Sequence, residues 1–336
     1  MKKFLIFLLM CLLVLHLGNV VAENNLMEKV TNKLDDIIRN FQIASPSEQA
    51  ANNEGEMSQT EIYNLLPLPK ISDSAFSIGE LAADEEDGQL SSIKLDIRND
   101  SYSEIDVDYL MGEKPALPLK EGSPQVLIIH THGSEAYTPA EGEEYEESDP
   151  YRTEDKAHNV IKVGDVLTQV LEAKGIRVIH DRELYDSPSY TGSYTRSGEA
   201  IEKYLKKYPS ISVVIDLHRD AIGSGDMAYK TKAEPSLGSC AQIMLLVGTG
   251  DNGLYHPRWQ ENMRLALYIQ QAMEQRYPSL ARPLAVKSER YNQHLSPGAM
   301  IVEVGTNGNT LAEAITAISY FGEAAGDVIK SLTVHE

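Results

Sequence analysis

The sequence is poor in cysteine and in basic residues, and both shortages exclude classes of protein. The chain of 336 residues has 2 cysteines, Cys11 and Cys240. Because Cys11 lies in the apolar N-terminus, we expect neither a disulfide framework nor a metal site built from thiolates. Lysine and arginine total 30 against 50 acidic residues, which gives a net charge of −20. Acidic stretches such as AADEEDG and EGEEYEESDPYRTED repel polyanions, so the composition argues against a nucleic-acid partner.

Long apolar runs are also scarce, and the clearest one lies at the N-terminus. Lys2 and Lys3 precede an apolar stretch from Phe4 to Leu15, and a weaker stretch continues to Ala22. The apolar stretch is about half of the ~20 residues that a spanning helix prefers, and the modest side chains near Ala22 suit a signal peptidase. We predict an export signal that is either cleaved after Ala22 or retained as a membrane anchor. Both versions place the protein outside the cytoplasmic membrane.

Composition divides the rest of the chain into two parts. Residues 23–120 change repeatedly in composition and end in GEKPALPLKEGSPQ, whose prolines and glycines are typical of a linker. We predict a stalk or accessory region there, after the signal or anchor at residues 1–22. Residues 121–336 have a regular pattern that predicts one catalytic domain, and their length is sufficient for a sizeable core.

Strand and helix patterns alternate along the predicted catalytic domain. Apolar strand segments QVLIIH, IRVIHD, SVVIDLH, AQIMLLVG and AMIVEVG are interspersed with segments of helical spacing, among them HNVIKVGDVLTQVLEAKG, SGEAIEKYLKKYP and WQENMRLALYIQQAMEQRYP. The last helix is predicted over TLAEAITAISYFGEAAGDVIKSL, with Asn309 or Thr310 as its cap. This alternation predicts an α/β fold with a mostly parallel central sheet and helices on both faces.

Three predicted strands end in side chains that carry chemistry. His132 follows IIH, His218 ends IDLH, and Glu303 lies in IVEVG. Because active groups collect beyond the carboxyl ends of parallel strands, we expect these three side chains at one edge of the sheet. Two imidazoles and a carboxylate are the usual protein ligands of a catalytic zinc ion, and the spacing His132-x-x-Glu135 lets both side chains reach one ion. Glu303 is then the candidate general base.

Histidines at strand ends also occur as hydrogen-bonded structural groups, so each further polar residue has two interpretations. His130 is either a ligand or a group that hydrogen-bonds one. His158 at a helix start is either a ligand or a cap. Arg219 either binds a substrate carboxylate or pairs with Asp220, and His294 is a candidate substrate contact. The stretch GTNGNT lacks the lysine of a phosphate loop, and no G-x-S-x-G nucleophile elbow is present.

Several long segments resemble one known family. The segments IIHTHGSEAYTP, GIRVIHDRELYDSPSYTGSYTRSGEAI, SVVIDLHRDAI and YNQHLSPGAMIVEVGTNGNTLAEA are similar to the stage II sporulation protein P family, over roughly residues 124–332. That family is related to zinc-dependent N-acetylmuramoyl-L-alanine amidases. The resemblance therefore implies a zinc amidase-like fold, Zn2+ as cofactor, peptidoglycan as substrate, and cleavage of the amide between muramic acid and L-alanine. It also implies an additional endopeptidase activity on peptide crosslinks.

Carried over residue by residue, the resemblance implies zinc ligands at His132 and His218 and a catalytic glutamate at Glu303. Its remaining carboxylate ligand has no clear counterpart. Related amidases place a glutamate on the first helix, whereas Glu154 here precedes the apolar spacing of that helix. We therefore predict Glu135 as the third ligand.

His158 or Asp155 is the substitute for that third ligand, so its identity stays open. The resemblance also implies two partners, a sporulation lytic transglycosylase and a membrane protein that anchors the complex. Two functions of other kinds compete with the amidase. The first is a metallocarboxypeptidase-like enzyme, which would use the same ligand types. The second is a non-catalytic wall-binding scaffold, which would have no chemical need for the three candidate residues.

Overall fold

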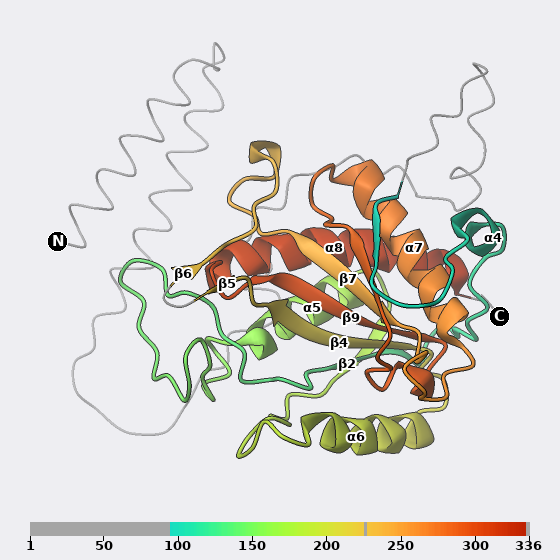
Figure 1. Ribbon diagram of the computed structural model, residues 1–336, viewed down its shortest axis with the longest axis horizontal. Helices are drawn as coiled ribbons and strands as arrows, with labels where there is room; N and C mark the ends of the chain where they lie inside the picture. The colour runs from blue at the N-terminus through green and yellow to red at the C-terminus, as the bar shows by residue number, and fades with distance from the viewer. Residues whose placement is uncertain (1–94, 225–226, 334–336) are drawn as a thin grey trace, which may run out of the picture. The chain divides into compact units, whose positions relative to one another are not determined.

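The computed structural model of the chain describes residues 95–224 and 227–333 (Figure 1). The predicted signal or anchor at residues 1–22 and most of the predicted stalk lie outside the described residues. Among the helices that are described, none has both the length and the apolar character needed to cross a membrane.

A central sheet, a short hairpin and helices make up the described residues. The strands are β1 (Ile97–Asn99), β2 (Pro124–Ile129), β3 (Arg177–His180), β4 (Val213–Asp220), β5 (Gly223–Ser224), β6 (Met227–Ala228), β7 (Ile243–Gly248), β8 (Leu284–Lys287) and β9 (Gly298–Thr306). The helices are α4 (Val107–Met111), α5 (Val160–Ala173), α6 (Ser193–Lys207), α7 (Trp259–Arg276) and α8 (Leu311–Leu332), with short 3-10 turns η1 (Pro235–Leu237) and η2 (Gln293–Leu295).

The sheet has seven strands in the order β1-β8-β7-β9-β4-β2-β3. Every neighbouring pair is parallel except β7 and β9, which are antiparallel. The predicted mostly parallel α/β fold is therefore confirmed. Because β2, β4 and β9 run in the same direction, their carboxyl ends meet at one edge of the sheet.

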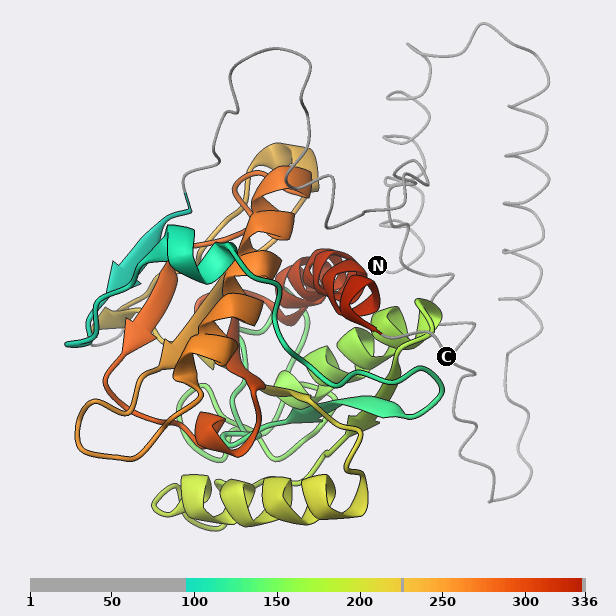
Figure 2. The same cartoon turned by 90° about the vertical axis from the view of Figure 1, so that its right-hand side faces the viewer.

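Helices cover both faces of the sheet, as predicted (Figure 2). Side chains alternate between the faces along each strand. On β2, Val126 and Ile128 belong to the large apolar core under α5, α7 and α8. Leu127 and Ile129 point the other way and pack in a smaller cluster under α6. Position parity along a strand therefore decides which face a residue joins.

The last part of the predicted stalk packs on this sheet domain. Strand β1 forms the edge of the sheet and pairs with β8 through Ile97 and Leu284. Leu110 and Leu119, each 1% exposed, are part of the large apolar core, and the Arg264 guanidinium donates a 2.6 Å hydrogen bond to the Leu110 carbonyl. The packed domain thus begins N-terminal to the predicted boundary at residue 121.

The last helix begins at the predicted cap. The Thr310 hydroxyl accepts a hydrogen bond from the Glu313 backbone N–H, and the Glu313 carboxylate accepts one from the Thr310 N–H. This reciprocal capping box pairs donors that the first helical turn would otherwise leave unpaired. The prediction of a cap at Asn309 or Thr310 is confirmed for Thr310. Asn309 instead hydrogen-bonds the Glu313 carboxylate through its side-chain amide.

Candidate active site

The structure brings the three predicted catalytic positions to one edge of the sheet. His132 lies in the turn after β2, His218 lies near the end of β4, and Glu303 lies in β9. His218 and Glu303 are paired in register across the parallel β4–β9 ladder, so their side chains lie on the same face. The imidazole rings of His132 and His218 are 5.4 Å apart and nearly perpendicular.

His218 lies between two buried carboxylates. Its Nε2 is 2.9 Å from Asp216 Oδ1, and its Nδ1 is 3.4 Å from Glu135 Oε2. Burial lowers the pKa of His218, but the negative charges of Asp216 and Glu135 outweigh burial and hold that pKa well above its ordinary value. In the metal-free protein, protonated His218 therefore compensates these carboxylates electrostatically at neutral pH, and a metal ion bound to its ring would displace one proton.

Two arginines complete the surroundings of Glu135. Arg152 Nη2 is 3.4 Å from Glu135 Oε1, and the Arg219 backbone N–H donates a 3.1 Å hydrogen bond to Glu135 Oε2. Burial raises the pKa of Glu135, but the hydrogen bond from His218 and the nearby positive charges reverse this effect and lower it to about 2. Glu135 is therefore a permanent carboxylate, which is the form that binds a cation.

Glu303 has the opposite electrostatic character. Burial and the negative charge of Glu135 raise its pKa to about 8, although His218 opposes the shift. Its Oε2 is buried and has no hydrogen-bond partner. Two carboxylates in one site thus have pKa values on opposite sides of neutrality. This separation is typical of sites in which one carboxylate binds and the other exchanges a proton.

His132 contacts two tyrosines at the start of α6. Its ring stacks on Tyr190 with 4.3 Å between centroids, and meets the edge of Tyr194 at 5.5 Å. Burial and the charge of His218 lower the pKa of His132 to about 4. His132 is therefore neutral at physiological pH, as a metal ligand must be. Its Nδ1 is buried without a hydrogen-bond partner.

The donor set fits zinc in chemical type. In residues 95–224 and 227–333, no three His, Cys, Asp or Glu side chains are grouped closely enough to hold a metal ion. However, His132 Nδ1 and Glu303 Oε2 are both buried and unpaired, and such atoms cost free energy unless a ligand satisfies them. His132 and His218, with Glu135 or Asp216, are the side chains that would hold the ion.

His130 faces away from this site. It directly follows β2 and continues the even-numbered positions of that strand, and its ring lies against Gly164 of α5. Its Nδ1 is 3.0 Å from the Leu217 carbonyl, and its Nε2 is 2.8 Å from His180 Nε2. A Cβ at Gly164 on α5 would lie 2.6 Å from His180 and 2.7 Å from His130, so only glycine leaves room for the pair. The ring nitrogens of His130 are both engaged in this structure.

The remaining predicted residues, His158, Arg219 and His294, have three different surroundings. His158 Nδ1 contacts Asp155 at 2.8 Å, and its ring stacks on Tyr145, so the structure does not bring this pair to His132. Arg219 is buried, and its guanidinium donates to backbone carbonyls, including Ala136 at 3.0 Å. His294 lies beyond Tyr194 and lines a hollow of about 330 Å³ with it.

Sequence reasoning missed four side chains of the site. Asp216 is two residues before His218, and the period of a strand puts both on one face, so the pattern DLH contained this signal. Tyr190 lies in the loop before α6 and Tyr194 in the first turn of α6, and the closeness of both to His132 depends on tertiary packing. Arg152 is 18 residues from Ser134 in sequence, yet its Nη1 is 3.0 Å from the serine hydroxyl. No local pattern indicates that contact.

Comparison with known proteins gives a family match. A family model described as Stage II sporulation protein P (SpoIIP) matches residues 19–325 of the chain. A curated relative, Stage II sporulation protein P of Bacillus subtilis (strain 168), is 29% identical over 219 residues, which are 62% of this chain and 50% of the relative. The chain thus matches about half the length of that relative.

Two solved structures with partial similarity are named as amidases. N-acetylmuramoyl-L-alanine amidase AmiC2 of Nostoc punctiforme is 13% identical with a TM-score of 0.37, over 62% of this chain and 97% of that chain. The CwlD amidase from Clostridioides difficile, solved in complex with the GerS lipoprotein, is 13% identical with a TM-score of 0.39, over 62% of this chain and 98% of that chain. TM-scores this low carry no assignment of activity.

Proposed function

Because the chain belongs to the stage II sporulation protein P family, we propose that it is a peptidoglycan hydrolase of sporulation. More narrowly, we propose a zinc-dependent N-acetylmuramoyl-L-alanine amidase that acts during engulfment of the forespore, with additional endopeptidase activity on peptide crosslinks. The observation that carries this proposal is the meeting of His132, His218 and Glu303 at one sheet edge. Among these residues, three buried polar atoms, His132 Nδ1, His218 Nε2 and Glu303 Oε2, make no hydrogen bond, although His218 Nε2 lies 2.9 Å from Asp216 Oδ1.

The roles of the residues follow from their charge states. His132, neutral and buried, would supply one nitrogen ligand, and His218, placed between two carboxylates, would supply the other once metal binding has displaced its proton. Asp216 accepts hydrogen bonds from the Thr131 N–H at 2.8 Å and hydroxyl at 2.6 Å, which fixes the carboxylate that orients His218. When bound, zinc supplies a Lewis acid that polarises a carbonyl and favours deprotonation of water.

Glu303 handles the proton. Its carboxylate accepts a proton from the attacking water and then delivers it to the amine of L-alanine as the amide breaks. A pKa raised to about 8 suits both transfers near neutral pH. Tyr190 and Tyr194 flank His132 and limit the access of bulk water from the α6 side.

The test compares Glu303→Gln with the wild-type protein on purified peptidoglycan. The substitution keeps the shape but removes the proton acceptor, so wall fragments should still bind while turnover falls by roughly 10²- to 10⁴-fold. Mass analysis of the wild-type products should reveal free stem peptides that begin with L-alanine. A chelator should abolish their release, and added zinc should restore it. Glu172→Gln, on the exposed surface of α5, is the matched control and should leave turnover unchanged.

The same experiment decides between the competing functions. Products cut only within the stem peptides would favour the metallocarboxypeptidase-like or endopeptidase alternative. A protein that cuts no wall fragment, even with zinc and a lytic transglycosylase present, would be the non-catalytic scaffold. Full activity of Glu303→Gln would overturn the mechanism.

We also propose the location and partners that the family implies. The protein acts outside the cytoplasmic membrane, beside a sporulation lytic transglycosylase and a membrane-anchoring protein. Mass spectrometry of the native protein tests the location, because the chain begins at Glu23 if the signal is cleaved and retains Met1 if it is an anchor. A protease-protected domain in intact cells would contradict both versions.

A further inference from the structure

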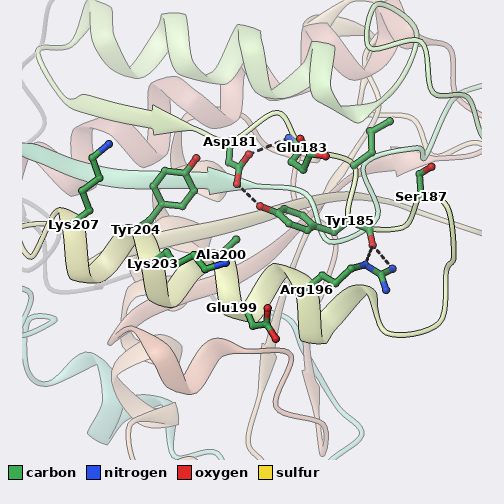
Figure 3. A pocket seen from close by; sticks show the side chains of 11 residues that line it. Asp181, Glu183, Tyr185, Ser187, Arg196, Glu199, Ala200, Lys203, Tyr204 and Lys207 are labelled. Atoms are coloured by element: carbon green, nitrogen blue, oxygen red, sulfur yellow. Dashed lines mark hydrogen bonds between the residues drawn. The ribbon is translucent and has the colours of Figure 1, made fainter.

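A second hollow lies beside α6, away from His132 and His218. It has a volume of about 550 Å³ and is lined by the loop after β3 and by one side of α6 (Figure 3). This volume is within the range of pockets that hold small ligands. Ser187 lines this hollow and also a smaller one that contains Arg152 and Tyr190. The loop from Asp181 to Tyr190 therefore connects the hollow to the candidate active site.

Two tyrosines and a carboxylate form the floor of the hollow. Tyr204 and Tyr185 lie on either side of Asp181 (Figure 3). Both tyrosines pack against the apolar cluster under α6, and both also line the hollow. The Tyr185 hydroxyl donates a 2.6 Å hydrogen bond to Asp181 Oδ2, and the Glu183 backbone N–H donates to Oδ1 at 3.0 Å. Asp181 is only 7% exposed, so its carboxylate is fixed before any ligand arrives.

The wall of the hollow is also held in place. Arg196 Nε donates to the Tyr185 carbonyl at 2.7 Å, and its guanidinium also hydrogen-bonds the Ser189 and Thr191 carbonyls. Arg196 of α6 thus hydrogen-bonds three backbone carbonyls of the loop that precedes the helix. A pocket whose wall is already ordered loses less conformational entropy when a ligand binds.

The charges around the hollow balance. Its lining has three acidic residues, Asp181, Glu183 and Glu199, and three basic ones, Arg196, Lys203 and Lys207. A balanced lining with aromatic rings favours an uncharged, hydroxyl-rich ligand over a polyanion. Ring faces contact the apolar face of a sugar, while carboxylates accept hydrogen bonds from its hydroxyls.

We propose that this hollow is a saccharide-binding subsite that holds a stretch of glycan strand beyond the bond that is cut. The proposal rests on the proposed function, because it assumes that the substrate is a polymer with sugars next to the scissile amide. Residues 196–207 extend roughly 16 Å along α6, at about 1.5 Å per residue. Tyr194, which touches His132, lies in the first turn of α6, and Tyr190 lies just before the helix, so the strand would follow α6 away from the active site.

The test uses a peptide-free N-acetylglucosamine oligosaccharide and the full chain, treated with chelator so that no hydrolysis occurs. Titration followed by NMR should shift backbone signals of the loop at Asp181–Tyr185 and of α6 near Tyr204. Tyr204→Ala should weaken the affinity roughly five- to tenfold, about the size of one lost aromatic contact. Tyr204→Phe keeps the ring and should retain most of the affinity.

Two charge variants sharpen the result. Lys206→Ala, on the exposed surface of α6 and outside the hollow's lining, is the control and should bind as the wild type does. Lys203→Glu should also leave saccharide binding unchanged, because the ligand is neutral. If Lys203→Glu instead abolishes binding, or if a sugar-free stem peptide shifts the same signals, the hollow binds anionic peptide and the proposal is wrong.

The proposed saccharide subsite would also be overturned if saturating oligosaccharide shifted no NMR signal, or only signals of residues around His132. This signal does not depend on whether Tyr204→Ala folds, because it is measured on the wild-type chain. Failure here is distinguishable from failure of the proposed function. If the chain binds the saccharide but does not hydrolyse peptidoglycan when zinc is present, only the proposed amidase activity is overturned. If it hydrolyses peptidoglycan but does not bind the saccharide, only the proposed subsite is overturned.

Discussion

On one face of the sheet, helices α5, α7 and α8 pack over a large apolar core, whereas the other face carries α6 and the loops that lead into it. Strand β4 belongs to both. Its odd-numbered residues Val213, Ile215 and Leu217 are part of the apolar core. Its even-numbered residues include Asp216 and His218, which are buried and charged. The same strand therefore stabilises the fold with one side and builds the candidate site with the other.

This division has a physical cause. Ionised groups are costly to bury unless they are paired, and on the α6 side they are paired with each other. His218 is held between Asp216 and Glu135, and Glu135 also contacts Arg152 and Arg219. Substitutions on the two faces should therefore separate loss of chemistry from loss of stability.

The largest effect is expected from His132→Ala and His218→Ala. Each removes a nitrogen ligand from a unit that works together, so hydrolysis should fall by roughly 10⁴-fold or more, and elemental analysis should show substoichiometric zinc. His256→Ala removes another buried histidine, which lies before α7, and should keep its zinc and activity. Full zinc occupancy in both ligand variants would contradict the assignment. The same assay on Glu135→Ala and His158→Ala identifies the third ligand.

On the face covered by α5, α7 and α8, a large loss of stability is expected without a loss of activity. Phe321 on α8 is fully buried in the apolar core, so Phe321→Ala should lower the free energy of unfolding by about 3–5 kcal/mol. Urea denaturation measures this loss. Turnover per folded molecule should stay near the wild-type value. A specific fall in turnover at low temperature, where the variant is folded, would show that the two faces are coupled.

A pH-dependent effect is expected from Glu303 in chelator-treated protein. Its pKa is about 8 when folded, against an ordinary value of 4.5. Between these pH values the unfolded chain has lost the proton that the folded chain keeps, so stability falls as pH rises, by at most about 1.4 kcal/mol per pH unit. The stability of Glu303→Gln does not fall in this way, because its amide side chain does not titrate. Its stability relative to wild type should therefore rise from about pH 4.5 to about pH 8 and then level off. A constant difference would show that the folded carboxyl titrates normally.

The alternation of apolar and polar residues in the sequence is sufficient to predict much of the sheet and part of the candidate site. Apolar runs and helical spacing predict the mostly parallel sheet, and the strand ends predict where His218 and Glu303 lie. Strict alternation also places Asp216 with His218, and His130 on the opposite face from Leu127 and Ile129. The contacts of Arg152, Tyr190 and Tyr194 could not be predicted, because the tertiary packing of loops and of α6 sets them. The antiparallel pairing of β7 with β9 likewise has no local signal, since buried strands of either direction are continuously apolar.

The smallest loss of stability is expected at the series of contacting side chains Asp165, His180 and His130. Asp165 Oδ1 is 3.3 Å from His180 Nδ1, and His180 in turn contacts His130, whose Nδ1 faces the carbonyl of Leu217 beside His218. If His130 donates to that carbonyl, its Nε2 must accept a hydrogen bond from His180 Nε2, and the Asp165 carboxylate lies at the other ring nitrogen of His180.

Asp165→Asn weakens that last interaction and should cost about 1 kcal/mol or less of stability, because Asp165 is partly exposed. Nitrogen NMR of the imidazoles should nevertheless show a shifted Nδ1 signal at His180, because the carboxylate beside that nitrogen is lost. Arg182→Ala is the matched control, since Arg182 contacts the other oxygen of Asp165 at 3.3 Å and its loss keeps the carboxylate. Unchanged imidazole signals in Asp165→Asn would mean that the histidine pair is fixed by packing against Gly164, and that the apolar face supports the active site through shape and not through charge.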